Sequence, residues 1–148
     1  MIRVPDQDRR RGERRKRHII VLVLVTMLAM LPAATGSARE GPVELSFEKE
    51  LVDSTNMIWE GTVDASGSIQ TVLTSLTPTG NVWHVEFDWS VLNPDFTAEV
   101  AGIINLKTGR VVLNGKVIDG LYEGSRIHVE TRIDLTDFSS EGSMLITP

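Results

Sequence analysis

Apolar and polar residues alternate along most of the chain from residue 44 onward. The clearest case is WHVEFDW at residues 83–89, where large apolar residues occupy every second position and His, Glu and Asp lie between them. Residues 126–134 repeat the pattern, with Ile127, Val129 and Ile133 alternating with charged residues or histidine. Because successive side chains of a β-strand point to opposite faces, this period of two predicts strands with one buried face and one wet face.

Glycine, asparagine and aspartate divide this alternating region into short segments, and no segment carries a sustained helical stripe. Short strands with closely spaced turn signals are typical of all-β sandwiches and barrels. The first segment, which contains LSFEKEL, is also compatible with the start of a helix. We predict eight strands, at residues 44–51, 57–64, 68–77, 82–91, 96–106, 110–118, 124–134 and 138–147.

The large aromatic residues indicate which face of the sheet lies inside. All the Trp and Phe residues of the chain fall on the apolar face of their predicted strands: Phe47, Trp59, Trp83, Phe87, Trp89, Phe96 and Phe138. Four glycines share that face, namely Gly61, Gly102, Gly115 and Gly142. Glycine inside a strand marks a sharp bend or a close backbone approach, and glycines opposite large rings fit a closed barrel. The expected fold class is therefore all-β, an up-and-down antiparallel eight-stranded barrel. Such a lumen is either filled by side chains or holds one small ligand.

The hairpin around Lys107-Thr108-Gly109 leaves two registers open. A turn centred on Lys107 and Thr108 pairs Ile103 with Val112, and Glu99 with Lys116, on the outer side. A bulge at Gly109 shifts the register by one residue and inverts the faces of the strand. The hydrophobic pattern favours the first register, whereas the Lys-Thr-Gly turn chemistry favours the second.

The first 38 residues have the three parts of a secretory signal peptide. Residues 1–18 carry eight basic and three acidic side chains, residues 19–31 are uncharged, and small residues follow up to Ala38, where we place the cleavage site. The apolar run of 13 residues is shorter than the roughly 17 to 25 needed to span a bilayer, although a retained anchor is the alternative. The predicted organisation is a signal peptide at 1–38, a short linker at 39–43 and a barrel domain at 44–148, in a secreted or periplasmic protein with no stable membrane insertion after cleavage.

Charge narrows the class of partner. The whole chain has a net charge of −5, but residues 39–148 carry 7 basic and 17 acidic side chains, a net charge of −10. Nucleic-acid binding depends on neutralising phosphates with Lys and Arg, so no nucleic-acid partner is expected.

The chain has no cysteine, which excludes disulfides and lipid attachment at a cysteine. An outer-membrane barrel would put the apolar faces toward lipid, but its terminal aromatic residue and tyrosine girdles are absent.

In plan, residues 44–148 resemble the allene oxide cyclase and dirigent type of eight-stranded barrel. The segments that carry the resemblance are WEGTV at 59–63, WHVEFDW at 83–89, and the closing pattern of Phe138, Gly142, Met144 and Ile146. The resemblance implies binding of a small apolar molecule in the barrel, sometimes with isomerisation. No catalytic residue of the family matches a position in this chain. Lipocalin-like and streptavidin-like barrels fit the same pattern, and a fold alone does not determine a function.

The candidate ligand-binding residues are the rings expected in the lumen: Trp59, Trp83, Phe87 and Trp89. They would form a rigid aromatic wall for an apolar ligand, or else a filled core. His84-Val85-Glu86 and His128-Val129-Glu130 would make a metal site only if their faces converged inside the barrel, so we expect solvated outer faces instead. No metal, no cofactor and no catalytic residue is predicted.

Three functions remain open at this point. The first is a binding module for a small hydrophobic molecule, and the second is a lumen-filled structural or interaction protein that acts through its outer face or as a homo-oligomer. Self-association would use an outer apolar patch formed by Ile103, Val112 and Ile118. The third is an isomerase of the allene oxide cyclase kind, which needs a polar group in the lumen. The residues expected to supply such a group are Thr71, Ser75, Thr131 and Ser140, with Lys49 if the first strand forms.

Overall fold

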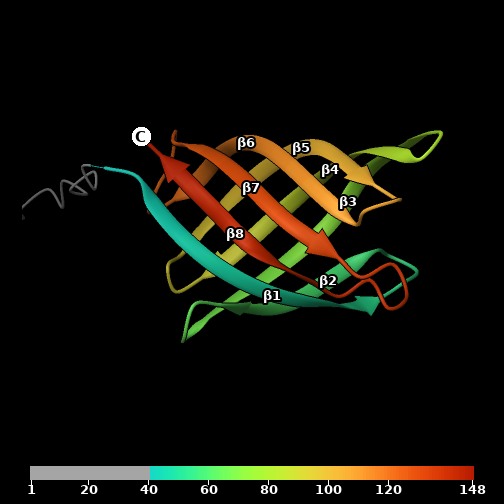
Figure 1. The fold of residues 1–148 in the computed structure, drawn as a ribbon. Coiled ribbons are helices and arrows are strands. Elements are labelled where there is room, and N and C mark those ends of the chain that lie inside the picture. The colour runs from blue at the N-terminus through green and yellow to red at the C-terminus, as the bar shows by residue number, and fades with distance from the viewer. Residues whose placement is uncertain (1–40) are drawn as a thin grey trace, which may run out of the picture. The chain divides into compact units, whose positions relative to one another are not determined.

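A closed barrel of eight antiparallel strands forms the part of the protein that the structure, a computed structural model, describes, residues 41–148 (Figure 1). Each strand pairs with the next in sequence, and β1 closes the barrel against β8. The strands are β1 (Val43–Asp53), β2 (Ile58–Val63), β3 (Gly67–Thr79), β4 (Val82–Leu92), β5 (Phe96–Asn105), β6 (Arg110–Gly120), β7 (Arg126–Ile133) and β8 (Ser140–Thr147). The predicted all-β up-and-down barrel is confirmed, and the first segment is a strand. The predicted signal peptide lies outside the described residues.

The strand boundaries agree with the predicted ones to within two residues, with one change of face. β3 contains a bulge, because its pairing with β4 shifts between Leu73 and Ser75. The bulge turns Ser75 outward and places Leu76 opposite Val85. Ser75 is exposed, so its predicted place in the lumen is wrong.

The hairpin between β5 and β6 takes the register that the hydrophobic pattern favours. Ile103 pairs with Val112 and Glu99 pairs with Lys116. Gly109 nevertheless adopts a left-handed conformation, with a φ of 68°, and its amide donates a hydrogen bond to the carbonyl of Asn105. The turn chemistry is therefore satisfied within the turn and does not displace the strands.

Apolar side chains from the inner faces of all eight strands fill the lumen along its length. Five of the seven Trp and Phe residues are buried, and the other two, Trp83 and Phe138, are half-buried at one end of the barrel. Phe138 precedes β8 and lies in the β7–β8 turn with a positive φ of 60°. The predicted orientation of the rings is confirmed, because the carboxylates of the described residues lie on the outer face or in the turns.

The inward glycines allow neighbouring strands to approach each other closely. A Cβ atom on Gly61 would lie 1.8 Å from the carbonyl oxygen of Glu48, and one on Gly102 would lie 2.0 Å from that of Val112. No side chain fits at such distances, so these positions require glycine. The close approach curls the sheet around its apolar face, as closure of a small barrel requires.

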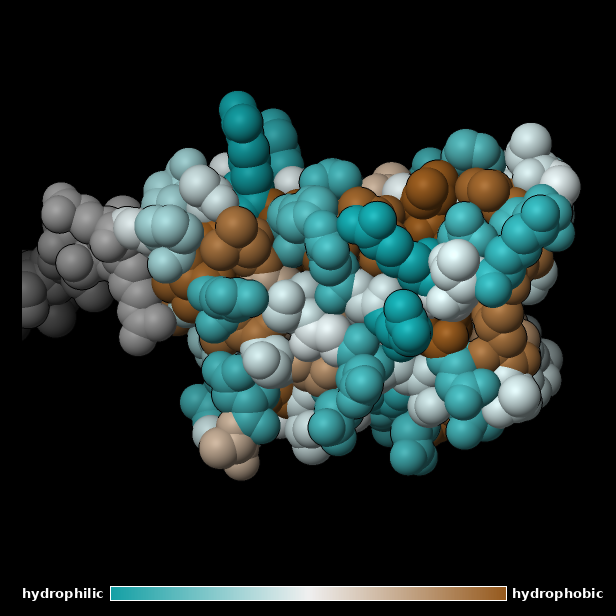
Figure 2. All heavy atoms as spheres, in the orientation of Figure 1, coloured by the Kyte–Doolittle hydropathy of each residue, from teal (hydrophilic) through white to brown (hydrophobic). Residues whose placement is uncertain are grey.

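One end of the barrel is defined by the turns β1–β2, β3–β4, β5–β6 and β7–β8, and we call it the turn end. It lies on the right in Figure 1, away from the C-terminus. Figure 2, in the same orientation, shows apolar side chains at this end and also at the opposite end, whereas polar side chains cover much of the wall between them. Within residues 41–148, no helix is long and apolar enough to cross a membrane.

Candidate functional site

A lysine lies inside the barrel. Lys49 continues the inward face of β1 after Leu45 and Phe47, and only 7% of it is exposed. Its two cross-strand neighbours are small, Gly61 on β2 and Ser140 on β8, which leaves space for the long side chain. The sequence pattern that placed Lys49 in the lumen if β1 formed is thus confirmed.

Four aromatic rings surround the amine of Lys49. Its Nζ lies 4.7 Å from the centroid of Trp89, 5.3 Å from that of Phe87, 5.7 Å from that of Trp59 and 5.8 Å from that of Phe47. All four distances are within the range in which a ring face attracts a cation. The rings hold one another in place by edge-to-face packing, in the pairs Phe47–Trp89 and Trp59–Phe87. The amine is therefore held in a preformed aromatic cage.

The Lys49 amine has a hydroxyl as its hydrogen-bond partner and no carboxylate. Nζ donates a hydrogen bond of 2.9 Å to Oγ1 of Thr71 on β3. Among the described residues, the buried polar or charged side chains are Lys49, Thr71, Thr131 and Ser140, so the lumen offers the ammonium no anion. Burial lowers the pKa of Lys49 to about 7, because the charged form loses its hydration.

Two polar atoms near the cage have no hydrogen-bond partner within the part of the chain that the structure describes. They are Oγ of Ser140 and Nε1 of Trp89, and both are buried. By contrast, the hydroxyl of Thr131 donates to the carbonyl of Glu141 at 2.6 Å. Buried polar groups usually find partners, so an unpaired hydroxyl and an unpaired indole N–H, together with an amine that has one hydrogen bond and no counter-ion, indicate unused hydrogen-bonding capacity in the lumen.

A small cavity of about 20 Å³ lies beside the amine, with Lys49, Thr131 and Ser140 as its polar lining. A second, apolar cavity of about 10 Å³ lies nearer the turn end. Four residues line both cavities: Trp59, Phe87, Ile104 and Ile133. A cavity needs roughly 10 to 15 Å³ to hold one water molecule, so in this conformation the lumen is almost completely filled.

The second cavity is closed toward solvent by apolar side chains from all four hairpins of the turn end. We call these residues the apolar mouth, and they are Met57, Leu73, Leu76, Trp83, Leu106, Leu135 and Phe138. Leu76 and Leu135 are 37% and 39% exposed, and the other five are half-buried. These side chains separate the second cavity from solvent, and several of them lie in turns.

The four predicted ligand-binding residues occupy different depths in the barrel. Trp83 is in the apolar mouth, Trp59 and Phe87 line both cavities, and Trp89 contacts the amine but lines neither cavity. Trp59 also donates from Nε1 to the carbonyl oxygen of Phe138 at 2.9 Å, which ties the β7–β8 turn to the cage. Sequence reasoning did not anticipate the cage around Lys49, because its rings come from three strands. The available signal was a lysine on the apolar face of a strand.

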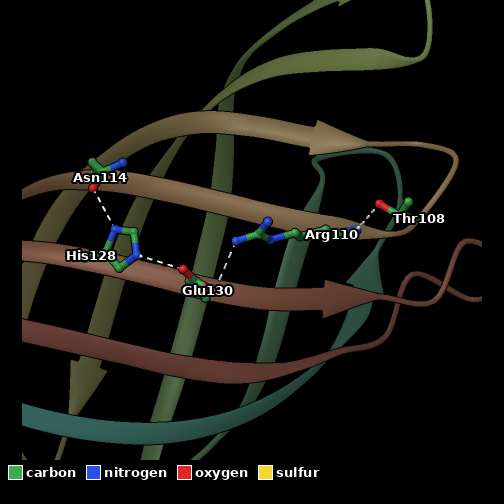
Figure 3. Close-up of polar contacts among 5 residues, drawn as sticks. All are labelled: Thr108, Arg110, Asn114, His128 and Glu130. Carbon is green, nitrogen blue, oxygen red and sulfur yellow. Dashed lines mark hydrogen bonds and ion pairs between the residues drawn. The ribbon is translucent and has the colours of Figure 1, made fainter.

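The two His-x-Glu segments lie outside the barrel, as expected, on β4 and β7, which are not neighbouring strands. In Figure 3, His128 lies between Asn114 and Glu130, with Nδ1 2.7 Å from Oδ1 of Asn114 and Nε2 3.3 Å from Oε1 of Glu130. Arg110 approaches the same carboxylate at 3.4 Å. The hydrogen bond with His128 and the charge of Arg110 lower the pKa of Glu130. These contacts join exposed side chains of β6 and β7, and the described residues contain no cluster of three metal-ligating side chains.

Other surface features are less enclosed. An open polar groove of about 600 Å³ lies near the turn end. Lys49 and Ser140 border it together with charged side chains of both signs, such as Glu48, Lys107 and Arg132. In the expected apolar patch, Ile103 and Val112 are cross-strand partners, whereas Ile118 lies six residues further along β6. The lumen is the more specific candidate, because it combines burial, a charged group and unpaired polar atoms.

No family model, curated protein sequence or solved structure matches this chain.

Proposed function

We propose that this barrel binds a small hydrophobic molecule, which enters through the apolar mouth and lies against Trp59 and Phe87. The observation that carries the proposal is the apolar mouth itself: at the turn end, apolar side chains from all four hairpins close an apolar cavity that leads toward the amine of Lys49. Binding sites for small molecules are mostly apolar concavities with a few placed polar groups, and the Lys49 cage supplies such groups.

Binding requires the mouth to open, because the two cavities hold about one water molecule each. The side chains that would move are half-buried and lie at strand ends or in turns, where local opening costs least. Met57 and Phe138 belong to the β1–β2 and β7–β8 turns, so their displacement leaves the strand pairing intact. We therefore infer a ligand that displaces Met57, Trp83 and Phe138 and occupies the space beneath them.

The test compares one substitution at the two ends of the barrel. Leu76→Arg places a charge in the apolar mouth, and Leu92→Arg places the same charge on an exposed leucine at the opposite end. Tryptophan fluorescence is titrated with a panel of apolar ligands. We expect saturable quenching for the unmodified protein and for Leu92→Arg, and at least about tenfold weaker binding for Leu76→Arg, since burying a charge against an apolar ligand is unfavourable. Equal binding by both variants would refute the location.

The alternative is a lumen-filled structural protein, which the small cavity volumes favour. It predicts a blue-shifted tryptophan emission that no ligand changes. An isomerase of the allene oxide cyclase kind is the further candidate suggested by the family resemblance, and Lys49 supplies the lumenal polar group that such an activity needs. Turnover of an apolar epoxide or ketone, lost in Lys49→Met, would favour that activity over binding alone.

Export and self-association also belong to this proposal. The basic head, apolar run and small-residue segment of residues 1–38 support secretion or periplasmic delivery. The cross-strand pair of Ile103, which is exposed, and Val112, which is half-buried, supports weak homo-oligomerisation through the outer face of β5 and β6. Fractionation of cells and sedimentation of the purified protein test these two points separately.

A further inference from the structure

We propose that Lys49 binds the carboxylate of the ligand, so that the hydrophobic molecule is an apolar monocarboxylic acid. This inference rests on the proposed function, since the acid must enter through the apolar mouth. Its basis is a mismatch of polar groups inside the barrel: the lumen contains an amine with donors to spare and no acid to pair with it.

The chemistry of the unused groups favours an anion. Lys49 has three N–H donors when protonated, and only one is directed to Thr71. The unpaired atoms nearby are a hydroxyl, which can donate, and an indole N–H, which can only donate. Of these groups, the amine of Lys49 and the hydroxyl of Ser140 line the same small cavity, and two donors that face one cavity without an acceptor describe a site for an oxygen-rich head group. A carboxylate has two acceptor oxygens and also brings the charge that a buried ammonium lacks.

The lumenal side chains that pack against the amine of Lys49 are uncharged. The elements packed against Lys49 present Trp59 and Gly61 from β2, Thr71 from β3, Phe87 and Trp89 from β4, and Ser140 from β8. None of these side chains titrates near neutral pH. Lys49 and Ser140 also border the open polar groove, whose charged lining includes Glu48, Lys107 and Arg132, but these side chains are exposed and screened by solvent. In a dry cage, an ion pair of this kind is much less screened than on the surface.

The position of Lys49 also limits the shape of the ligand. Lys49 lies four residues from the end of β1, which corresponds to about 13 Å along the strand and roughly 10 Å along the axis of a barrel with tilted strands. The acid would therefore carry its apolar body between the head group and the turn end. The two cavities are arranged along the same direction, the polar one beside the amine and the apolar one nearer the turn end. They share the lining residues Trp59, Phe87, Ile104 and Ile133.

The amine requires protonation to form the ion pair, so binding is linked to pH. In the free protein the pKa of Lys49 is about 7, and a bound carboxylate raises it. At pH 8 most free molecules carry a neutral amine, and binding of the acid takes up nearly one proton per site. Affinity for the acid should fall about tenfold per pH unit above pH 8, whereas affinity for a neutral ligand should not change.

The experiment uses decanoate and decanol, which share an apolar chain and differ in charge. Calorimetric titrations are run with the unmodified protein, Lys49→Met and Ser140→Ala, at pH 6.5 and pH 8, in buffers with different ionisation enthalpies. We expect the unmodified protein to prefer decanoate by about tenfold or more at pH 6.5, as a charge-assisted hydrogen bond provides. Lys49→Met should bind decanoate no more tightly than decanol and should take up no proton on binding. Ser140→Ala should weaken decanoate binding alone.

The outcomes separate the two proposals. If decanol and decanoate bind equally to the unmodified protein and to Lys49→Met, the apolar site stands and the carboxylate inference is overturned. If neither probe binds, the proposed function fails together with the inference. A further titration uses decanal, the aldehyde with the same apolar chain. If decanal binds more tightly than decanoate and borohydride reduction leaves it covalently bound to Lys49, the amine forms an imine with a carbonyl compound. That result would also overturn the carboxylate inference.

Discussion

Lys49→Met should change how the stability of the barrel depends on pH. Methionine has an unbranched side chain one heavy atom shorter than that of lysine and cannot be protonated, so the variant removes one titration and little volume. In the folded protein the pKa of Lys49 is about 7, against 10.5 in the unfolded chain. Between these two pH values the unfolded chain binds a proton that the folded chain does not, so the free energy of unfolding rises with pH. Below pH 7 both states are protonated, and the destabilisation is at its full value.

The magnitude follows from the two pKa values. The full destabilisation amounts to a few kcal/mol, up to about 5, and about 2 kcal/mol of it is relieved between pH 7 and pH 9. Met at this position also leaves the hydroxyl of Thr71 without its donor, which costs about 1 kcal/mol at every pH. The diagnostic quantity is therefore the change with pH of the difference between the two proteins, and not its value at one pH.

Urea unfolding followed by tryptophan fluorescence at pH 7, 8 and 9 measures this difference. The matched control is Lys116→Met, which removes an exposed lysine from the outer face of β6. The unmodified protein and the control should gain about 2 kcal/mol relative to Lys49→Met over this pH range. Parallel pH profiles for Lys49→Met and the unmodified protein would refute the burial of an uncompensated amine.

The remaining predictions concern the barrel wall and the turn end. Gly102→Ala should lower the free energy of unfolding by at least about 2 kcal/mol, since the new Cβ would lie 2.0 Å from a carbonyl oxygen of β6. Gly80→Ala, at a turn with open space but a φ of 60°, should cost only about 1 kcal/mol in the same urea titration, and equal losses would contradict the close strand approach. Trp59→Phe removes the hydrogen bond to the carbonyl of Phe138 and should lower stability by about 1 kcal/mol in thermal melts, whereas an unchanged melting temperature would show that the bond contributes nothing. His128→Ala should shift the melting temperature by less than about 4 °C, and a larger loss would show that the contacts on the outer face are structural.

The sequence predicted the barrel because its period of two is strong wherever a strand has one buried face. In residues 83–89 and 126–134 the pattern has no break, and both segments form strands with the expected faces. The register of the β5–β6 hairpin followed from matching apolar positions, because a slip of one residue would have exposed the whole inner face of one strand. Inward glycines opposite aromatic rings likewise indicated closure.

The sequence-based predictions failed where the alternating pattern is interrupted or where side chains from several strands meet. In residues 72–76, Val-Leu-Thr-Ser-Leu contains no regular alternation, so the bulge that turns Ser75 outward left no clear trace in the sequence. The environment of Lys49 depends on aromatic rings from β2 and β4 as well as β1. The pattern of a single strand does not show which side chains of other strands pack against it. The size of the cavities depends on side-chain packing across the lumen, which a pattern of apolar positions does not encode.

Direct titration of Lys49 provides the most immediate test of the account. The ¹³Cε resonance of this side chain, identified by its absence from the spectrum of Lys49→Met, reports the protonation of the amine as the pH is varied. We predict a titration midpoint near pH 7, well separated from those of the surface lysines, and a shift to higher pH when decanoate is added. A midpoint near 10.5 would show that the amine is hydrated, and the aromatic cage, the unpaired charge and the carboxylate site would all be contradicted by that result.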